Sequence, residues 1–312
     1  MNENSSKSEK PGLRSGYDLP VYGLSNGSFY YIHIPALVCI LCSFSCAIIT
    51  LTFVFKHGNF RKFFTWSKSN RFVVYMAICD GGFNIVHSMD HIHYVVTKEH
   101  VRPKELCDLY GFLLVEFISS QILMSNVVAI NAFMIMVFKK QLIFGKYDWK
   151  LLTWTFGIPF VCASIAGAFK QFGPAGSFCL FDGVNGGTAN IVLTTVPLLI
   201  FLTLNSGLYI ITWRKIKQDT SGLHQDIQTE NTANKSKRAA KNMSMFVVAF
   251  IIQWWPLGPS GIWTLIDVNV PQALIHAGTI FSNIGGCLNL CIYLIIRRRN
   301  KIAAIETTSV AR

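Results

Sequence analysis

Hydrophobic residues gather in seven long runs along this chain of 312 residues, and shorter polar segments separate the runs. A helix needs about 20 apolar residues to cross a hydrocarbon core of about 30 Å, where every backbone polar group must be paired within its own segment. All seven runs meet this requirement: Tyr30 to Phe55, Phe72 to His93, Leu106 to Phe138, Leu151 to Phe169, Ala189 to Trp213, Met243 to Ile266 and Pro271 to Ile296. The pattern predicts an all-α membrane protein, a bundle of seven transmembrane helices.

The polar segments define the organisation around this bundle. We expect a tail of residues 1–29, a transmembrane domain of residues 30–296 and a second tail of residues 297–312. Residues 218–237, between the fifth and sixth runs, are too polar to bury and predict a flexible loop. The basic cluster from Arg297 to Lys301 suits an anionic membrane surface. Either Ile302 to Ile305 follow it as a short helix lying on that surface, or the cluster is only a stop-transfer signal.

Composition agrees with lipid as the solvent. The chain is 51% hydrophobic and only 14% charged, whereas a soluble domain carries about 25% charged residues. A net charge of +12 would indicate nucleic-acid binding if the basic residues shared one soluble face. They lie instead in short clusters between the apolar runs, so we expect a lipid bilayer as a partner and no nucleic acid.

Basic residues also predict the orientation. Most of the 28 Lys and Arg residues lie in the loops on one side of the bundle, and cytoplasmic loops carry the excess of Lys and Arg. Seven crossings then place the N-terminus outside and the C-terminus in the cytoplasm of a multi-pass plasma-membrane protein. Asn4 and Asn26 begin glycosylation sequons in the outer tail, although Asn234 also begins one on the inner side.

Cysteines divide into two groups. Most of the nine lie within apolar runs, where a small polarizable side chain packs well. Cys107 and Cys179 lie on the outer side, at the start of the third helix and in the loop after the fourth. Because the exterior is oxidising, we expect a disulfide that holds this loop across the mouth of the bundle, with two free thiols as the alternative.

Polar side chains inside the helices are candidates for mechanism, because they are costly in lipid. Asp80 lies in the middle of the second helix, either as a structural hydrogen-bonding residue or as a cation or proton site. On the third helix Glu116, Ser119, Ser120 and Asn126 share one face. That face either lines a wet cavity or makes hydrogen bonds between helices.

Two further motifs lie in the last two helices. In Gln253-Trp254-Trp255-Pro256 the proline removes a backbone hydrogen bond and should bend the sixth helix. Asn289 and Tyr293 lie one turn apart in the seventh helix. Both could hydrogen-bond to Asp80 or to water, which would couple the second and seventh helices.

The outer end of the second helix is rich in histidine. His87, Asp90 and His91 could converge there as zinc ligands or as a proton sensor, and His33 and His276 lie at the outer ends of the first and seventh helices. The alternative is a set of polar residues at helix ends, and spacing alone establishes no metal site. Our hypothesis is that extracellular acid or zinc changes activity through His87 and His91.

These features together resemble the G-protein-coupled receptor superfamily over nearly the whole chain. The resemblance rests on seven helices and on Cys107 with Cys179, Ala77 with Asp80, Trp254 with Pro256, and Asn289 with Tyr293. Phe156-Gly157-Ile158-Pro159, Pro197 to Ile210 and Gly285 to Asn289 are most similar to the cyclic-AMP-receptor-like group. The rhodopsin-like pattern is interrupted by Asn131-Ala132-Phe133, where an acidic residue, Arg and Tyr are expected, and by Leu290 in place of Pro.

The resemblance implies a receptor, not an enzyme, with no cofactor. It implies that an extracellular ligand drives the inner end of the sixth helix outward and so signals to a heterotrimeric G protein. Basic residues at the inner rim are candidates to face this partner: Lys139, Lys140, Lys215, Lys237, Arg238 and Lys241. Candidates for the ligand pocket are Phe112, Glu116, Trp255, Trp263 and Asn283, although the aromatic residues could face lipid.

The ligand and three rival functions stay open. A buried phosphate requires Arg or Lys, and only Lys170 lies near the outer halves of the helices, which argues against cyclic AMP itself. The first rival is a receptor fold that binds a ligand or partner without activating a G protein, as Asn131-Ala132-Phe133 would allow. The others are an intramembrane zinc hydrolase built on the histidines and a transporter, for which the chain lacks repeated halves.

Overall fold

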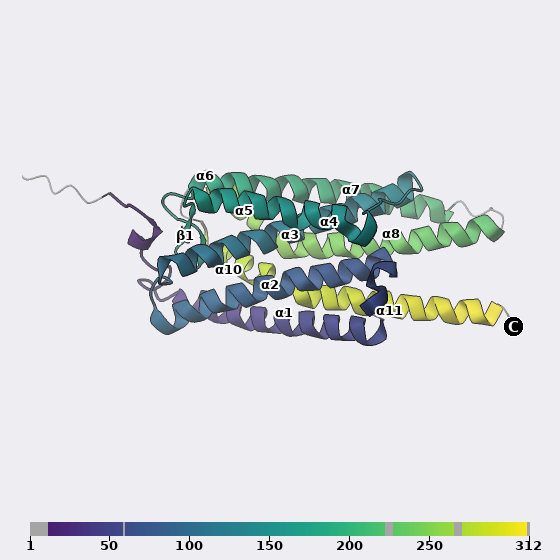
Figure 1. Cartoon of the computed structure of the whole chain (residues 1–312), viewed down its shortest axis with the longest axis horizontal. Coiled ribbons are helices and arrows are strands. Elements are labelled where there is room, and N and C mark those ends of the chain that lie inside the picture. The colour runs from purple at the N-terminus through teal and green to yellow at the C-terminus, as the bar shows by residue number, and fades with distance from the viewer. Residues whose placement is uncertain (1–11, 59, 222–226, 265–269, 311–312) are drawn as a thin grey trace, which may run out of the picture.

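The computed structural model describes residues 12–58, 60–221, 227–264 and 270–310. Its helices form one elongated bundle (Figure 1). Five helices of the described chain are long and apolar enough to cross a membrane, and two bent helix pairs bring the number to seven if each pair is one span. The seven-helix architecture expected from the hydrophobic pattern is therefore present.

The first three spans are single helices: α1 (Phe29–His57), α2 (Lys68–Thr97) and α3 (Lys104–Val137). The fourth combines α4 (Trp149–Leu152) with α5 (Ile158–Ala168), and the fifth combines α6 (Gly187–Asn190) with α7 (Val196–Ser221). A π-helical turn joins each of these pairs, Thr153–Gly157 and Ile191–Thr195. Pro159 and Pro197 follow these turns, and a proline ring that clashes with the carbonyl four residues earlier explains why each helix widens there.

The last two spans are bent. α8 (Ile227–Trp254) meets α9 (Leu257–Thr264) at 42°, with Pro256 in the break, so the expected bend of the sixth helix is confirmed. α10 (Gln272–Ser282) meets α11 (Gly285–Val310) at 44°. This second bend was not expected. The Asn283 amide there donates to the Thr279 carbonyl at 2.7 Å, which caps the end of α10.

The two ends of the bundle differ in character. A short hairpin of β1 (Phe172–Pro174) and β2 (Cys179–Phe181) covers one end, and the C-terminal part of α11 lies at the other (Figure 1). We call these the disulfide end and the basic end. The 3-10 helices η1 (Gly16–Asp18) and η2 (Phe60–Thr65) lie at the disulfide end and the basic end, respectively.

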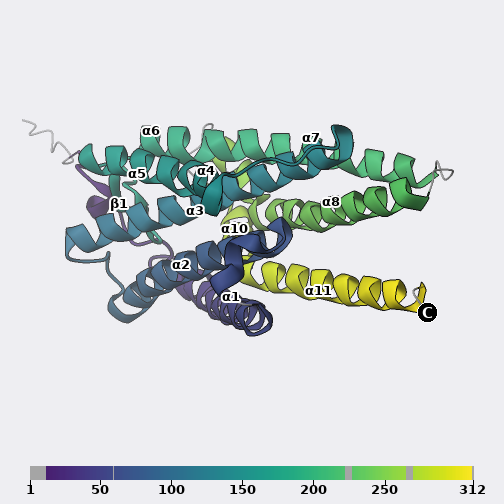
Figure 2. The same ribbon diagram turned by 45° about the vertical axis from the view of Figure 1, so that its right-hand side comes forward.

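The helices at the basic end are longer than the polarity of their sequence indicates. Residues 218–237 are largely helical, because α7 continues to Ser221 and α8 begins at Ile227, while residues 222–226 lie outside the described residues. α11 runs without a break through the basic cluster to Val310, so Ile302 to Ile305 continue α11 and form no separate surface helix within the described residues. This favours the stop-transfer alternative. α8 and α11 consequently extend beyond the end of α1 (Figure 2).

α3 is the central helix. It packs against α2, α5, α7, α8 and the hairpin. In α2 and in α3, 67% of the most apolar stretch of 18 residues is buried inside the protein, whereas in the fifth span only 17% of that stretch is buried. The outward side chains of peripheral spans are apolar, as Leu41, Phe160 and Ile200 illustrate. Such a surface suits lipid, because lipid tails are as apolar as these side chains.

Candidate functional site

Asp80 is the centre of a hydrogen-bond network that joins four spans. Its buried carboxylate accepts the side-chain amides of Gln121 on α3 and Asn289 on α11. The Gln253 amide on α8 donates to the Gln121 oxygen at 3.3 Å and to the Ser282 carbonyl at 3.0 Å. The expected contact between the second and seventh helices is made through Asn289.

Two glycines allow α11 to approach the network. A side chain at Gly285 would overlap the Asp80 carboxylate, and one at Gly286 would overlap the Ser43 backbone of α1. The Gly286 amide instead donates to the Ser43 hydroxyl at 2.9 Å, and Asn84 donates to the same oxygen at 2.9 Å. The Gly-Gly pair therefore holds α11 against both α1 and α2.

Sequence reasoning gave no role to the two glutamines of this network. Gln121 lies beside the face of α3 that holds Glu116 and Asn126, so the helical spacing that groups those polar residues does not include it. Asn126 instead donates to Asn205 of α7 at 2.9 Å, which favours the interhelical interpretation for that residue. An amide within an apolar run was the signal that could have identified Gln121 and Gln253.

Side chains near the proline bend occupy different environments. Trp254 is buried with Ile122, Leu198 and Phe250. Trp255 and Trp263 are 42% and 41% exposed. The two tryptophans beside Pro256 therefore point to different surroundings, one into the bundle and one toward its exterior.

The five proposed ligand-pocket residues do not gather around one described cavity. Phe112 packs edge-to-face on Phe160 and Phe172, and Trp255 packs on Phe281. One cavity of about 310 Å³ lies at the disulfide end and one of about 280 Å³ at the basic end, and none of the five residues lines either.

Glu116 and Asn283 are buried polar residues with incomplete partners. Ser120 donates to one Glu116 oxygen at 3.4 Å, while the other oxygen has no partner among the described residues. The same holds for the side-chain oxygen of Asn283. Both side chains therefore offer acceptors inside the bundle.

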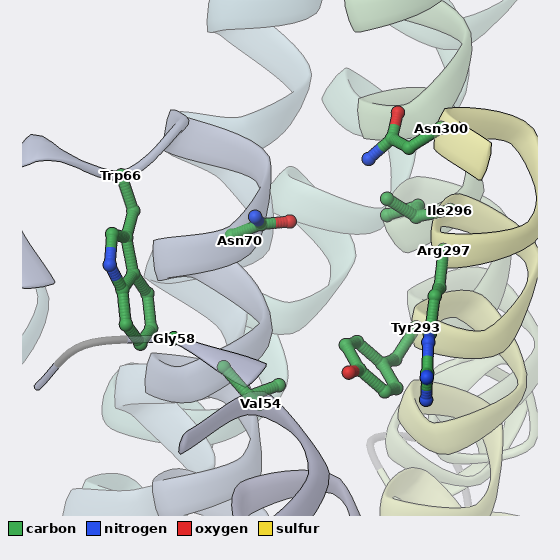
Figure 3. Close-up of a pocket in the computed structure, with 8 residues that line it drawn as sticks. All are labelled: Val54, Gly58, Trp66, Asn70, Tyr293, Ile296, Arg297 and Asn300. Carbon is green, nitrogen blue, oxygen red and sulfur yellow. The ribbon is translucent and has the colours of Figure 1, made fainter. Parts of the chain in front are cut away.

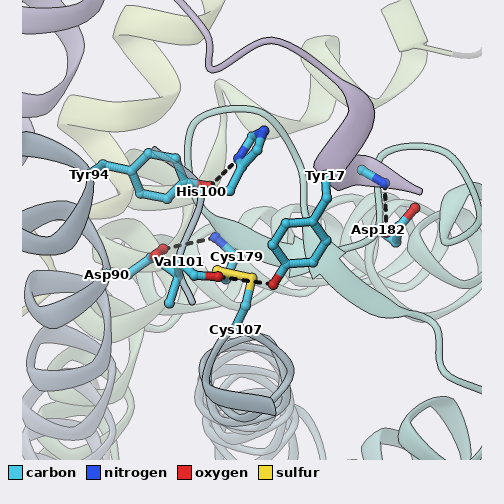
Figure 4. Close-up of a disulfide and its surroundings, with 9 residues drawn as sticks. Tyr17, Asp90, Tyr94, His100, Val101, Cys107, Cys179 and Asp182 are labelled. Carbon is cyan, nitrogen blue, oxygen red and sulfur yellow. Dashed lines mark hydrogen bonds between the residues drawn. A yellow bond between two sulfur atoms is a disulfide. The ribbon is translucent and has the colours of Figure 1, made fainter. Parts of the chain in front are cut away.

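The disulfide end is tied together by Cys107 and Cys179, which form the expected bond (Figure 4). Asp90 takes part in this arrangement, because its carboxylate accepts the Cys179 backbone amide at 2.9 Å. Asp90 thus anchors the hairpin to α2, where we had considered it as a zinc ligand.

The segment before α1 lies across the same end. Asp182 accepts the Gly16 amide at 2.8 Å, and the Tyr17 hydroxyl donates to the Val101 carbonyl at 3.0 Å (Figure 4). Burial raises the pKa of Tyr17 to about 12, so its hydroxyl keeps the donated proton at physiological pH. The Tyr22 amide adds a bond to the Gly176 carbonyl at 3.0 Å. Hairpin and N-terminal segment together cover the mouth of the bundle.

Three histidines form a buried chain between α1 and α2. Nδ1 of His33 lies 2.7 Å from Nδ1 of His91, and Nε2 of His91 lies 2.8 Å from Nε2 of His87. No three His, Cys, Asp or Glu side chains among the described residues could hold a metal ion. His276 lies on α10. The imidazoles hydrogen-bond to one another, which favours the proton interpretation over the zinc interpretation.

Asn131 links three elements at the basic end. Its oxygen accepts the Leu142 amide in the loop after α3 at 2.9 Å, and its amide lies 3.0 Å from the Met243 sulfur of α8. The side chain is fully buried. The first residue of the divergent Asn131-Ala132-Phe133 triplet therefore holds α3 close to α8.

The basic residues expected to face a G protein all lie near this end. Lys139 and Lys140 follow α3, Lys215 lies on α7, and Lys237, Arg238 and Lys241 lie on α8. Tyr293 lies here too: it lines the cavity between α1, α2 and α11. Among the glycosylation candidates, Asn26 is exposed before α1, and Asn4 lies outside the described residues.

Known proteins resemble this chain in fold or in sequence. Squid rhodopsin superimposes with a TM-score of 0.65 over 91% of this chain and 86% of its own, at 16% sequence identity. The cyclic AMP receptor-like protein A of Dictyostelium discoideum is 26% identical over 193 residues, which is 60% of this chain and 47% of the relative. The chain thus spans about half the length of this curated relative.

A family model settles the classification. The model of the 7 transmembrane receptor (rhodopsin family) matches residues 48–293, which include Asp80, the bend at Pro256 and Tyr293. This is a family of membrane receptors and not of enzymes. The chain belongs to the rhodopsin family of seven-transmembrane receptors.

Proposed function

We propose that this protein is a G-protein-coupled receptor of the plasma membrane, with the disulfide end outside the cell and the basic end in the cytoplasm. It transmits the binding of an unidentified extracellular ligand to a heterotrimeric G protein. The Asp80 network is the observation that carries this proposal, because it joins α2, α3, α8 and α11 between the two ends. A ligand acts through its different affinity for two arrangements of these helices.

α8 is the helix expected to move. Pro256 bends it, and Asn131 holds its basic end near α3 through Met243. Outward movement of this end would break the Asn131 contact and expose the basic rim to an acidic partner. The mechanism therefore needs two local changes, one at the bend and one at Asn131.

A second function is supported by the divergent triplet. Ala132 stands where the resemblance predicts Arg, so the receptor could bind a ligand or partner without activating a G protein. Ligand binding without any G-protein response would favour this alternative.

Heterotrimer dissociation measured by energy transfer tests the proposal. Cells with confirmed surface expression would be assayed with a panel of Gα subunits, with extracellular pH, zinc and cyclic AMP as trial stimuli. We expect dissociation above mock cells for at least one Gα. Charge reversal of the rim, as in Arg238→Glu with Lys241→Glu, should reduce the signal at equal surface expression. A bound ligand with no response for any Gα would contradict the proposal.

A further inference from the structure

Most of the free thiols of the described chain lie on α1 and α11, two helices that pack against each other. The cysteines concerned are Cys39, Cys42 and Cys46 of α1 and Cys287 and Cys291 of α11. Within each helix they are three or four residues apart, and side chains at this spacing share one face. The two helices therefore carry a cluster of nucleophilic side chains that the Asp80 network does not use.

The closest approach of the two helices brings one thiol of each together. The Gly286 amide donates to the Ser43 hydroxyl at 2.9 Å, and a side chain at Gly286 would overlap the Ser43 backbone. Cys287 follows this glycine, and Cys46 lies one turn after the serine. The thiols of Cys46 and Cys287 lie in hydrogen-bond contact. The pair is therefore placed for a bond between its two sulfur atoms.

This pair is accessible from the lipid. Cys46 and Cys287 are half-buried, while Cys42 and Cys291, one turn away on their respective helices, are exposed. An exposed side chain in the middle of an apolar span faces hydrocarbon, because lipid tails are as apolar as the span itself. A reagent dissolved in the bilayer can therefore reach the thiols, whereas polar reagents in water are disfavoured there.

The surroundings decide which reaction the thiols can undergo. A thiol normally reacts as its thiolate, and a charge in hydrocarbon is costly. Residues 34–55 and 285–296 contain no Asp, Glu, His, Lys or Arg, so neither helix supplies a base or a counter-ion along these stretches. A neutral thiol can still give up a hydrogen atom, and that step creates no charge. The environment thus favours radical oxidants of the lipid phase.

We propose that Cys46 and Cys287 are a modification site for lipid peroxyl radicals, which oxidise the two thiols to a disulfide between α1 and α11. Each S–H bond breaks, and its hydrogen atom passes to one peroxyl radical, which is reduced to a lipid hydroperoxide. The two sulfur radicals then combine to form the S–S bond. Two peroxyl radicals are consumed for each disulfide, and no charged intermediate is required.

The new bond would hold α11 at a sensitive place. The bend between α10 and α11 lies directly before Gly285. Nearer the basic end, Val54 of α1 and Tyr293 of α11 line a cavity of about 280 Å³ (Figure 3). The disulfide ties the two helices together between the bend and this cavity. Oxidation of the surrounding lipid is thereby recorded in the position of α11.

Peptide mapping of the full chain in polyunsaturated phospholipid bilayers tests the site. A lipid-soluble azo initiator would supply peroxyl radicals, and mass spectrometry would identify linked peptides after the remaining thiols are blocked. The Cys46–Cys287 pair should accumulate about tenfold over any pair that includes Cys162, a half-buried free thiol on α5. Cys46→Ser and Cys287→Ser should each abolish the linked peptide, whereas Cys162→Ser should keep it.

Thermal unfolding gives a second readout, because a disulfide restricts the unfolded chain. Oxidation should raise the unfolding temperature of the parent chain and of Cys162→Ser, and dithiothreitol should reverse the rise. Cys46→Ser should show no rise. If Cys46→Ser fails to fold before oxidation, Cys287→Ala provides the same comparison from the other helix.

Two results would overturn the proposal. One is oxidation scattered over Cys42 and Cys291 as sulfinic and sulfonic acids without a linked peptide, since exposure alone would then decide the reaction. The other is equally fast linking by hydrogen peroxide from the aqueous phase, which would exclude the lipid as the source of the oxidant. Neither measurement needs a ligand or a G protein, so the result is independent of coupling.

Discussion

Asp80 shows at the scale of single residues why the centre of this bundle is sensitive to small chemical changes. Its two carboxylate oxygens each accept one amide, from Gln121 and from Asn289. An Asn at this position has one acceptor and one donor in nearly the same volume. Its NH₂ group would then face the donor of Gln121 or of Asn289.

Asp80→Asn should therefore lower the thermal stability of the purified receptor. The expected cost is about 1–3 kcal/mol, the usual range for a buried donor left without an acceptor. The exchange Asp80→Asn with Asn289→Asp should recover most of it, because the new amide on α2 then accepts from Gln121 and donates to the new carboxylate on α11. Unfolding temperatures in detergent measure both effects. Additive losses in the double variant would show that the two side chains do not interact.

The histidine chain carries a different consequence. When all three imidazoles are neutral, each carries one N–H group, and each of the two His–His contacts contains one N–H donor. The three N–H groups then all point in the same direction along the row of histidines. One added proton gives His91 two N–H groups, which then donate to His33 and His87. Apart from one another, the three imidazole rings contact the aromatic rings of Phe29, Phe83, Phe178 and Tyr94. None of these four side chains carries a negative charge at neutral pH.

Acid should lower the unfolding temperature of the receptor through this chain, because a buried charge without a counter-ion is costly. The other titratable side chains nearby are Asp90, whose carboxylate is bonded to Cys179, and His100, which contacts Tyr94 at 3.1 Å. His91→Phe should remove most of the change between pH 7.5 and 5.5, while His93→Phe, on the same helix but outside the chain, should keep it. An unchanged pH dependence in His91→Phe would assign the effect elsewhere.

At the scale of elements, Asn131 connects the end of α3 to its loop and to α8. The Leu142 amide depends on the Asn131 oxygen, and Met243 of α8 is the other partner. If α8 moves outward on activation, this contact belongs to the inactive arrangement. Its loss should favour the active one.

Asn131→Ala should raise basal G-protein dissociation and lower thermal stability by about 1–3 kcal/mol, because the Leu142 amide loses its acceptor. Asn131→Asp keeps that acceptor and should preserve more of the stability. Basal energy transfer at matched surface expression gives the first result, and thermal unfolding gives the second. Unchanged basal activity in a destabilised Asn131→Ala receptor would show that the contact is only structural.

Helices and bends were predictable from the sequence where residues within the same segment determine them. Each apolar run gave a span, and Pro256 gave the bend of the sixth helix. The bend between α10 and α11 was missed, since it depends on the Asn283 cap and on the fit of Gly285 against Asp80. The helical extensions of α7, α8 and α11 were also missed, because polarity alone does not distinguish a solvated helix from a loop.

The same limit applied to the candidate site. Compartment and position predicted the Cys107–Cys179 bond, and cost in lipid identified Asp80. Gln121 became visible only through its contact with Asp80, and the contact of His33 with His91 only through the packing of α1 on α2. Contacts between helices depend on rotation and register, which a hydrophobic run leaves undetermined.

For the whole molecule, orientation decides which partners each end can meet. The basic and disulfide ends lie at opposite ends of the bundle (Figure 1). Because the excess of Lys and Arg stays in the cytoplasm, we expect an N-terminal epitope tag to be labelled in intact cells. A C-terminal tag should be labelled only after permeabilisation.

Glycosylation gives an independent test of this orientation. Only sequons that enter the secretory lumen are modified, so glycosidase treatment should increase the gel mobility of the parent chain. Asn4→Gln with Asn26→Gln should abolish this shift, whereas Asn234→Gln, which removes a sequon from the basic end, should leave it unchanged. Asn26 is exposed and accessible for modification. Loss of the shift in Asn234→Gln alone would place the basic end outside, and would exclude a G protein as its partner.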